Sequence, residues 1–275
     1  MDQQEPLSPE AVLTWHLEAG VDETIGEDVQ NRFAEKPPVP VAPEVGKSEP
    51  SPETSPETPD ARQSASRVPS VNGDAAVKNA YTLAVAANTV AELREALESF
   101  DGCPLKKTAT NLVFGDGSDT ARIVFVGEGP GAEEDRQGIP FVGPSGKLLD
   151  RMLSSINVQR SDVYISNTVF WRPPGNRSPT TQEIAACMPF VERLIEIIDP
   201  DILVTVGGPA ATSLLGETQG VGRLRGKWFS YSTARLPAPI QATALFHPAY
   251  LLRTPARKRE AWRDMLAIKA KLGAE

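Results

Sequence analysis

The apolar positions of this chain fall into short, uninterrupted runs separated by longer segments of mixed character. Short apolar runs rich in β-branched residues predict buried strands, here over 122–126, 163–167, 202–206, 228–231 and 242–246. The longer segments predict helices over about 89–100, 145–156, 179–198, 207–215 and 255–272. Strands that alternate with helices predict an α/β fold, in which a parallel sheet carries helices on both faces.

Capping residues support these helices and add one more near the start of the chain. Thr89 and Glu92 have the spacing of a capping box. A short helix is also expected over 9–19, because Ser8 can cap it and Gly20 can end it.

Composition divides the chain into parts. Between Phe33 and Tyr81 there is no Leu, Ile, Phe, Met, Trp or Tyr, and nine Pro fall between residues 36 and 69. Such a stretch buries too little apolar surface to offset chain entropy. We therefore expect a short N-terminal helical segment over 1–34, a disordered Pro-rich, acidic linker over 35–78 and one domain over 79–275.

Charge and cysteine content narrow the function class. Two Cys cannot form a disulfide framework, no apolar run approaches the length of a membrane span, and the acidic N-terminus is unlike a signal peptide. A cytoplasmic protein without membrane contact is therefore expected. Residues 1–78 hold 6 Lys/Arg and 15 Asp/Glu, whereas 221–263 hold nine Lys/Arg and one acid. The basic segment predicts attraction to phosphate, although a solvated basic face would have the same composition.

In the predicted sheet, ligands sit beyond the carboxyl ends of the strands. The first strand is followed there by Gly127-Glu128-Gly129-Pro130-Gly131. A dinucleotide-binding loop is disfavoured because the third glycine is misplaced, no helix is expected at once, and Asn167 ends the second strand in place of an acid. Glycines here would let backbone N–H groups approach a planar ligand, and an ordinary strand-to-helix turn is the alternative.

Three further side chains lie at or near this predicted edge. Asn167 offers a donor and an acceptor that suit the edge of a pyrimidine, or it caps a turn. Phe141 could stack on a base or belong to the core. His247 is either a core histidine or a functional one among basic residues. The apolar residues 250–252 follow it on a segment expected to be an exposed loop, where they could enter a base stack.

Together these segments resemble the uracil-DNA glycosylase superfamily, most closely its family 4. The resemblance rests on Gly-Glu-x-Pro-Gly at 127–131, Pro-Phe-Val-Gly at 140–143, Asn167 followed by Arg-Pro-Pro at 172–174, and His-Pro-Ala-Tyr-Leu-Leu-Arg at 247–253. It covers about residues 103–266. It implies a three-layer α/β/α sandwich around a mainly parallel four-stranded sheet, and hydrolysis of the N-glycosidic bond of deoxyuridine in DNA.

The resemblance also implies residue roles. His247 would donate a hydrogen bond to uracil O2, and Glu128 would hold the attacking water, so these two are the expected catalytic residues. Residues expected to bind uracil are Gly127, Gly129, Glu134, Phe141 and Asn167. Within this set, Phe141 would stack on the base, Asn167 would read its edge, and Glu134 would exclude the thymine methyl group. Because Gly129 stands where better-studied relatives carry Asp, the identity of the general base stays open.

DNA contacts follow in the same way. Ser145 and Gly146 would bind a phosphate at a helix N-terminus. Leu251 would fill the gap left by the flipped base, and Arg253 would contact the DNA backbone. The expected partner is uracil-containing DNA, bound by a monomer, whereas no partner is implied for the N-terminal segment.

The resemblance breaks down at a metal centre. Family 4 enzymes hold a [4Fe–4S] cluster with four Cys, and the corresponding positions here are Phe100, Cys103, Trp171 and Cys187. Two thiolates cannot hold the cluster, so no cofactor and no metal are expected. The aromatic rings of Phe100 and Trp171 would fill its volume, with Cys103 and Cys187 buried close together.

Two alternatives to hydrolysis are weighed from the sequence. One branch of the superfamily traps DNA covalently through a His in a basic insertion after the strand-two Asn, but 170–179 is short and has no His. The other alternative is a DNA-binding module without chemistry, which the intact Glu128, Asn167 and His247 disfavour.

Overall fold

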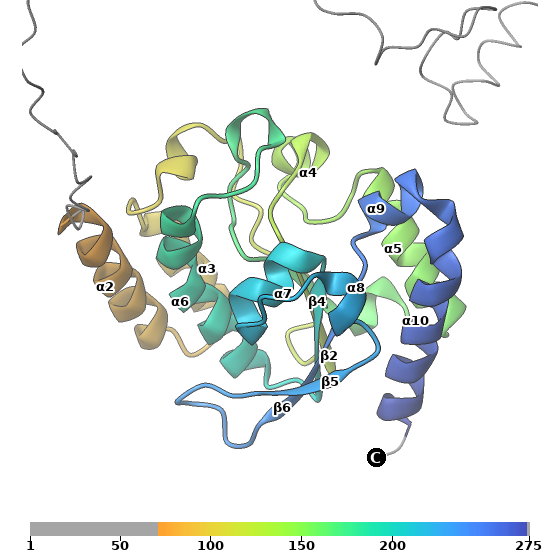
Figure 1. Cartoon of the computed structure of the whole chain (residues 1–275). Helices are drawn as coiled ribbons and strands as arrows, with labels where there is room; N and C mark the ends of the chain where they lie inside the picture. The colour runs from red at the N-terminus through yellow and green to blue at the C-terminus, as the bar shows by residue number, and fades with distance from the viewer. Residues whose placement is uncertain (1–70, 274–275) are drawn as a thin grey trace, which may run out of the picture. The chain divides into compact units, whose positions relative to one another are not determined.

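The computed structural model describes residues 71–273 (Figure 1). The predicted helix over 9–19 and most of the predicted linker lie outside the described residues. Helix α2 (Val71–Ala86) takes in residues 71–78, so the predicted linker extends too far toward the C-terminus. Residues 71–78 lack large apolar side chains, and further along the same helix Ala80 and Ala84 are buried. Alanine favours helix and allows close packing, here against α6 (Thr181–Ile198).

The described residues form a six-stranded sheet in the order β1-β3-β2-β4-β6-β5. Its strands are β1 (Asp116–Gly117), β2 (Ile123–Gly127), β3 (Tyr164–Asn167), β4 (Ile202–Val206), β5 (Trp228–Tyr231) and β6 (Ile240–Leu245). The four central strands are parallel, and the edge strands β1 and β5 pair antiparallel. The predicted α/β class and parallel sheet are confirmed. The resemblance implied four strands and the apolar pattern predicted five, among them the edge strand β5, so only the edge strand β1 was not expected.

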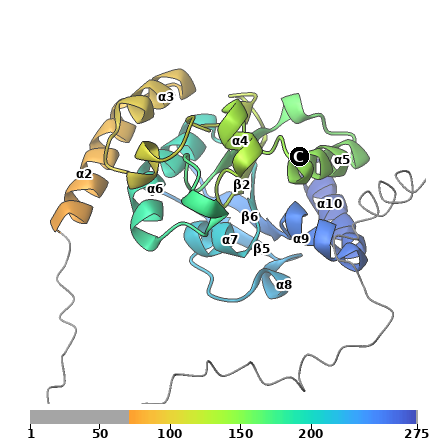
Figure 2. The ribbon, with the colours of Figure 1, turned by 90° about the horizontal axis from the view of Figure 1, so that it is seen from above.

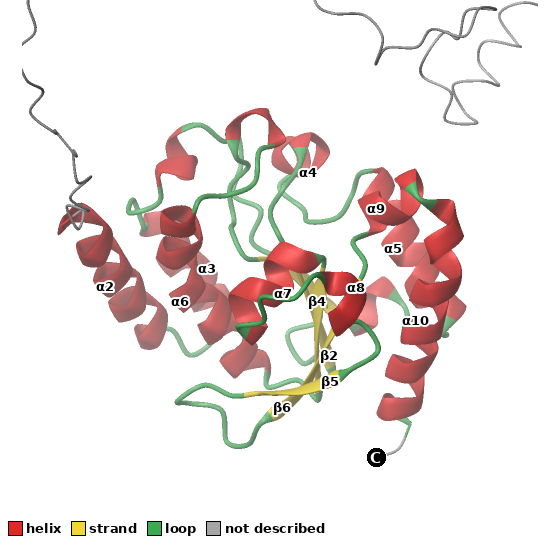
Figure 3. Ribbon diagram, viewed as in Figure 1, coloured by secondary structure: helices red, strands yellow, loops and turns green. Residues whose placement is uncertain are grey.

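Both faces of the sheet are buried. Along β2, Val124 and Val126 pack into one hydrophobic cluster and Ile123 and Phe125 into another. Helices α2, α3 (Val90–Ser99) and α6 cover the first face, and α5 (Pro144–Ser155) and α10 (Lys258–Leu272) cover the second (Figures 1 and 2). The strands therefore lie between two helical layers, as Figure 3 shows by colour, and the three-layer prediction is confirmed.

Several short elements were not expected. They are α4 (Ala132–Gln137), α8 (Val221–Leu224), α9 (Pro248–Arg253) and the 3-10 turns Pro104–Lys107, Arg160–Asp162 and Pro174–Asn176. The helix predicted over 255–272 is found as the 3-10 turn Pro255–Arg257 followed by α10. The predicted helix over 207–215 is found as α7 (Gly208–Leu215). Helix α4 corrects the expectation that no helix soon follows the first strand. In the described part of the chain, no helix combines the length and apolar character that crossing a membrane requires.

Candidate active site

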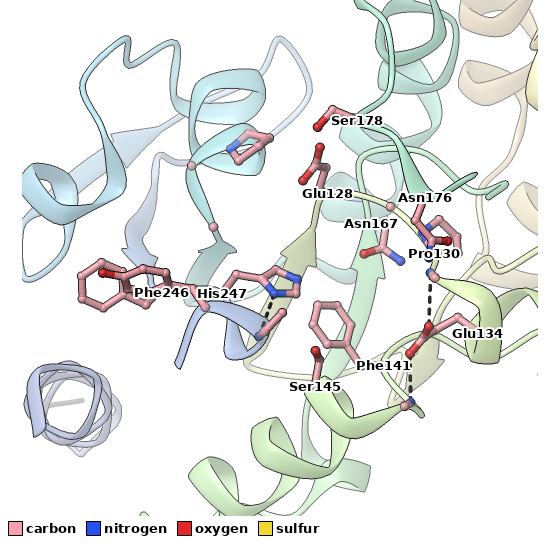
Figure 4. Close-up of a pocket in the computed structure, with 18 of the residues that line it drawn as sticks. Glu128, Pro130, Glu134, Phe141, Ser145, Asn167, Asn176, Ser178, Phe246 and His247 are labelled. Carbon is pink, nitrogen blue, oxygen red and sulfur yellow. Dashed lines mark hydrogen bonds between the residues drawn. The ribbon is translucent and has the colours of Figure 1, made fainter. Parts of the chain in front are cut away.

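A cavity of about 1020 Å³ opens at the carboxyl ends of the central strands. It is lined by residues that follow β2, β3, β4 and β6, as expected for a parallel sheet. Figure 4 shows Glu128, Phe141, Asn167 and His247 around this cavity. The structure therefore brings together side chains as far apart in the sequence as Glu128 and His247, which are 119 positions apart.

Two polar atoms in this cavity have no hydrogen-bond partner among the described residues. They are Oε1 of Glu128 and Oδ1 of Asn167, and both are buried. The two residues are held side by side because β2 and β3 pair in parallel, with Gly127 opposite Asn167. Buried polar atoms are rarely left unpaired, so these two mark places where a ligand or water supplies the missing hydrogen bonds.

Gly127 is required by this close approach. A Cβ added there would lie 2.5 Å from Oδ1 of Asn167 and 2.7 Å from Cζ of Phe141. Gly129 also lines the cavity, and its added Cβ would lie 2.8 Å from a methyl group of Val169. Both glycines therefore let the strand-end loop pass close to neighbouring side chains.

Phe141 belongs both to the core and to the cavity. Its side chain packs in the cluster of α5 and α10, and the residue is only 5% exposed. Its ring centroid lies 5.7 Å from that of His247, with 30° between the planes. The two readings of Phe141 are therefore compatible, because a ring held by the core can present its remaining face to a base.

His247 is the N-cap of α9, and its Nδ1 accepts a hydrogen bond of 3.1 Å from the backbone N–H of Ala249. The proton of the neutral ring is therefore on Nε2. Burial and, to a smaller extent, the positive charge of Arg253 lower the pKa of His247 to about 4, against an opposing effect of Glu134. At neutral pH this side chain is an uncharged donor.

Glu134 has a structural role that the sequence did not show. Its Oε1 accepts hydrogen bonds from the backbone N–H groups of Val142 and Gly143, each at 3.0 Å, and its Oε2 accepts one from Gly131 at 3.1 Å. The carboxylate therefore ties the loop after β2 to the loop that carries Phe141. Glu134 also lines the cavity, and its effect on a thymine methyl group stays a prediction.

The predicted phosphate contacts differ in exposure. Ser145 lines the cavity near the start of α5, whereas Gly146 is buried. A Cβ on Gly146 would lie 1.7 Å from the carbonyl oxygen of Phe141, so this glycine is needed for packing. A phosphate contact by either residue stays a prediction.

The segment after His247 is a helix, so the expectation of an exposed loop was wrong. Pro248 at the first helical position and the His247 cap start α9. Its helical turn buries Leu251, which is 1% exposed and packs with Phe246, while Leu252 is 42% exposed. Leu251 is therefore not presented to DNA in this structure, and Leu252 is the exposed apolar side chain.

Some of the positive charges in the predicted basic segment over 221–263 are paired with carboxylates of the same domain. Arg225 forms two hydrogen bonds with Asp264, and Arg257 pairs with Glu260. Arg253 is exposed and lines the cavity, as a backbone contact would require. The charge count alone therefore overstates how many cations are available to DNA.

Sequence reasoning missed two walls of the cavity. One comes from the turn after the Arg-Pro-Pro segment, where Arg177 is held by both oxygens of Glu183. The other comes from Gly207-Gly208-Pro209 after β4 and from the start of α8. Because Gly207 directly follows a buried strand, its position was a signal for the second wall.

The four positions that hold the cluster in family 4 lie in one apolar region here. Phe100, Cys103, Trp171 and Cys187 are all buried in the cluster that contains α3 and α6. The ring of Phe100 lies 5.2 Å from that of Phe190. The Cys187 thiol donates a hydrogen bond to the sulfur of Cys103, and this bond together with burial raises the pKa of Cys187. The predicted closeness and burial of the two thiols are confirmed.

These residues do not fit a [4Fe–4S] cluster. Only two of the four positions offer sulfur, and no group of three or more potential metal ligands occurs within residues 71–273. Aromatic rings stand where the other two thiolates would be.

Comparison with known proteins agrees with this geometry. The family model of the uracil DNA glycosylase superfamily matches residues 114–266. The type-4 uracil-DNA glycosylase of Thermotoga maritima is 44% identical over 160 residues, which cover 58% of this chain and 81% of the relative. The type-4 enzyme of Archaeoglobus fulgidus is 42% identical over 170 residues, or 60% of this chain and 84% of the relative. That of Pyrobaculum aerophilum is 38% identical over 178 residues, or 63% and 90%. This chain belongs to the uracil-DNA glycosylase superfamily.

Proposed function

We propose that this protein hydrolyses the N-glycosidic bond between uracil and deoxyribose in DNA and leaves an abasic site. The observation that carries the proposal is the pair of unpartnered buried oxygens on Glu128 and Asn167, in one cavity with a neutral His247. The activity in the names of the type-4 relatives supports it.

In this proposal the base leaves the duplex stack and enters the cavity, because its glycosidic bond cannot be reached inside DNA. Uracil stacks on Phe141. Its N3–H donates to Oδ1 of Asn167, and the Asn167 amide donates to O4. Cytosine presents an acceptor at its N3 and an amino group at C4, so it leaves this amide mismatched.

Bond cleavage leaves negative charge on uracil and positive charge on the sugar. The Nε2–H of His247 donates to uracil O2 as that charge develops. Glu128 lines the cavity with a buried, unpartnered carboxylate oxygen, and we assign it to hold the attacking water and to stabilise the cationic sugar. Gly129 has no side chain with which to do this.

We also propose that the protein works without an iron–sulfur cluster, because its residues offer two thiols where four are needed. The purified protein, prepared without oxygen, should be colourless and contain no stoichiometric iron. A tightly bound cluster in such a preparation would overturn this part of the proposal.

The central experiment measures uracil release from U:G, U:A and single-stranded oligonucleotides, with thymine and hypoxanthine substrates as controls. Free uracil with an abasic strand supports the proposal. A DNA adduct that survives denaturation would indicate covalent trapping. Binding without either product would indicate a DNA-binding module, and Asn167→Ala serves as the matched inactive variant.

A further inference from the structure

The backbone of Phe141 is in an unusual conformation for its residue type. Its φ is 52°, in the left-handed region that a β-carbon disfavours. The other described non-glycine residues with positive φ are Asn157, Asn176 and Asp199. Asn and Asp tolerate this region, whereas a bulky aromatic residue there is a true outlier.

One guanidinium binds both peptide groups that flank Phe141. Nη2 of Arg160 donates to the carbonyl of Pro140 at 2.6 Å, and Nη1 donates to the carbonyl of Phe141 at 3.1 Å. The φ and ψ angles of Phe141 describe the relative rotation of these two peptide planes. A planar group bound to both carbonyls therefore restrains both angles together.

The guanidinium is itself held by two carboxylates. Nε of Arg160 pairs with Asp116 of β1 at 2.7 Å, and Nη1 pairs with Asp150 of α5 at 3.0 Å. The side chain of Arg160 is 24% exposed. On the opposite side of the same loop, Glu134 binds the N–H groups of the next two residues. The loop is thus fixed through its carbonyls by Arg160 and through its amides by Glu134.

We propose that Arg160 is a positioning residue, which holds Phe141 in its left-handed conformation so that the ring meets the flipped base. The inference rests on the proposed function, in which Phe141 is the stacking surface for uracil. Backbone strain that surrounding contacts maintain is often found at functional sites. A Gly or Asn at position 141 would relieve the strain but would remove the ring.

The test compares Arg160→Lys with a matched control, Arg193→Lys. Arg193 is also largely buried and binds a backbone carbonyl, that of Ala87, and a carboxylate, that of Glu196, but its contacts lie away from the cavity. Lysine keeps the positive charge yet cannot bind two carbonyls in the fork geometry of arginine. Unfolding of both variants is measured beside single-turnover uracil release over a range of DNA concentrations.

We expect Arg160→Lys to raise the half-saturating concentration of uracil-containing DNA about tenfold, within the range for loss of one base–aromatic stack. Its affinity for undamaged DNA should stay unchanged, as should both properties of Arg193→Lys. In a Phe141→Leu background, Arg160→Lys should have little further effect, because Arg160 acts through the ring.

Asp150→Asn provides a second variant if Arg160→Lys does not fold. It keeps the guanidinium and removes one of the carboxylates that orient it, so a smaller shift in the same direction is expected. If the wild-type protein releases uracil and Arg160→Lys leaves the half-saturating DNA concentration unchanged, the inference is overturned while the proposed function stands. The same holds for an unchanged value in Asp150→Asn, where Asp150→Asn is used because Arg160→Lys does not fold. The inference is also overturned if Arg160→Lys raises the half-saturating DNA concentration equally in the wild-type and the Phe141→Leu backgrounds. A wild-type protein that releases no uracil would overturn the proposed function and this inference with it.

Discussion

The charge state of His247 gives a sharp prediction, because burial moves its pKa from the ordinary 6.5 to about 4. Between these two values the unfolded chain binds a proton on this side chain and the folded protein does not. The protein therefore loses stability as pH falls through this window. A difference of about 2.5 pKa units corresponds to at most about 3.4 kcal/mol of unfolding free energy, at 1.36 kcal/mol per unit, of which about 3 kcal/mol is reached by pH 4.

Two measurements test this value. The chain has two histidines, so His16→Gln leaves the His247 ring as the one imidazole in an NMR titration. We expect a neutral ring protonated on Nε2 at pH 6 and a midpoint near 4. In denaturation experiments, wild type should lose up to about 3 kcal/mol more than His247→Gln between pH 7 and pH 4. The loss of the α9 cap is the same at both pH values and cancels in this comparison. A midpoint near 6.5 in the folded protein would refute the assignment of a neutral donor.

Four other changes have defined outcomes. Asn167→Asp should lose uracil release in the single-turnover assay, because a carboxylate cannot donate to O4, and undiminished release would exclude edge reading. Arg253→Ala should weaken DNA binding and lower the salt slope by about one unit, whereas the distant Arg94→Ala should not. Trp171→Ala should lower the free energy of unfolding by about 3–5 kcal/mol in denaturant titrations, as cavity-forming substitutions do. Removal of residues 1–70 should leave uracil release intact, and loss of the folded domain would show that this segment contributes to stability.

The parts predicted well from sequence depend on local patterns. Strand β4 was located to the residue because all five of its side chains are buried, which produces an uninterrupted apolar run. Helix α3 was found from its cap, since Thr89 does accept a hydrogen bond from the N–H of Glu92. The glycines and Asn167 were recognised because the carboxyl ends of parallel strands share one edge of the sheet.

The features that were not predicted are those whose structure depends on tertiary packing and not on a local sequence pattern. The first half of helix α2, residues 71–78, lacks large apolar residues, so it left no periodic signal of a helix. Helix α9 is six residues long, and Leu251 packs there against Phe246 and Ala261 of α10, which is why its burial was not expected from the sequence. The bonds from Arg160 to residues 140 and 141 join segments about twenty positions apart, and no local pattern encodes them.

The segment that follows Asn167 connects the candidate active site to Trp171, one of the positions at which the resemblance to family 4 implies a cluster cysteine. Thr168 donates its backbone N–H to the carbonyl of Gly127 and its hydroxyl to the carbonyl of Glu128. Three residues later the same segment ends at Trp171, which is 3% exposed in the apolar core. One end of the segment therefore fixes Glu128 and Asn167 relative to each other, and the other end is anchored by burial of an indole ring.

In the family 4 pattern that anchor would be a thiolate bound to iron, which also constrains the chain at a single point. A buried aromatic ring constrains the same point through dispersion and burial of apolar area. Such packing does not depend on iron supply or on the oxidation state of a cluster. Because Trp171 is not among the residues that line the cavity, the replacement leaves the polar side chains of the cavity unchanged.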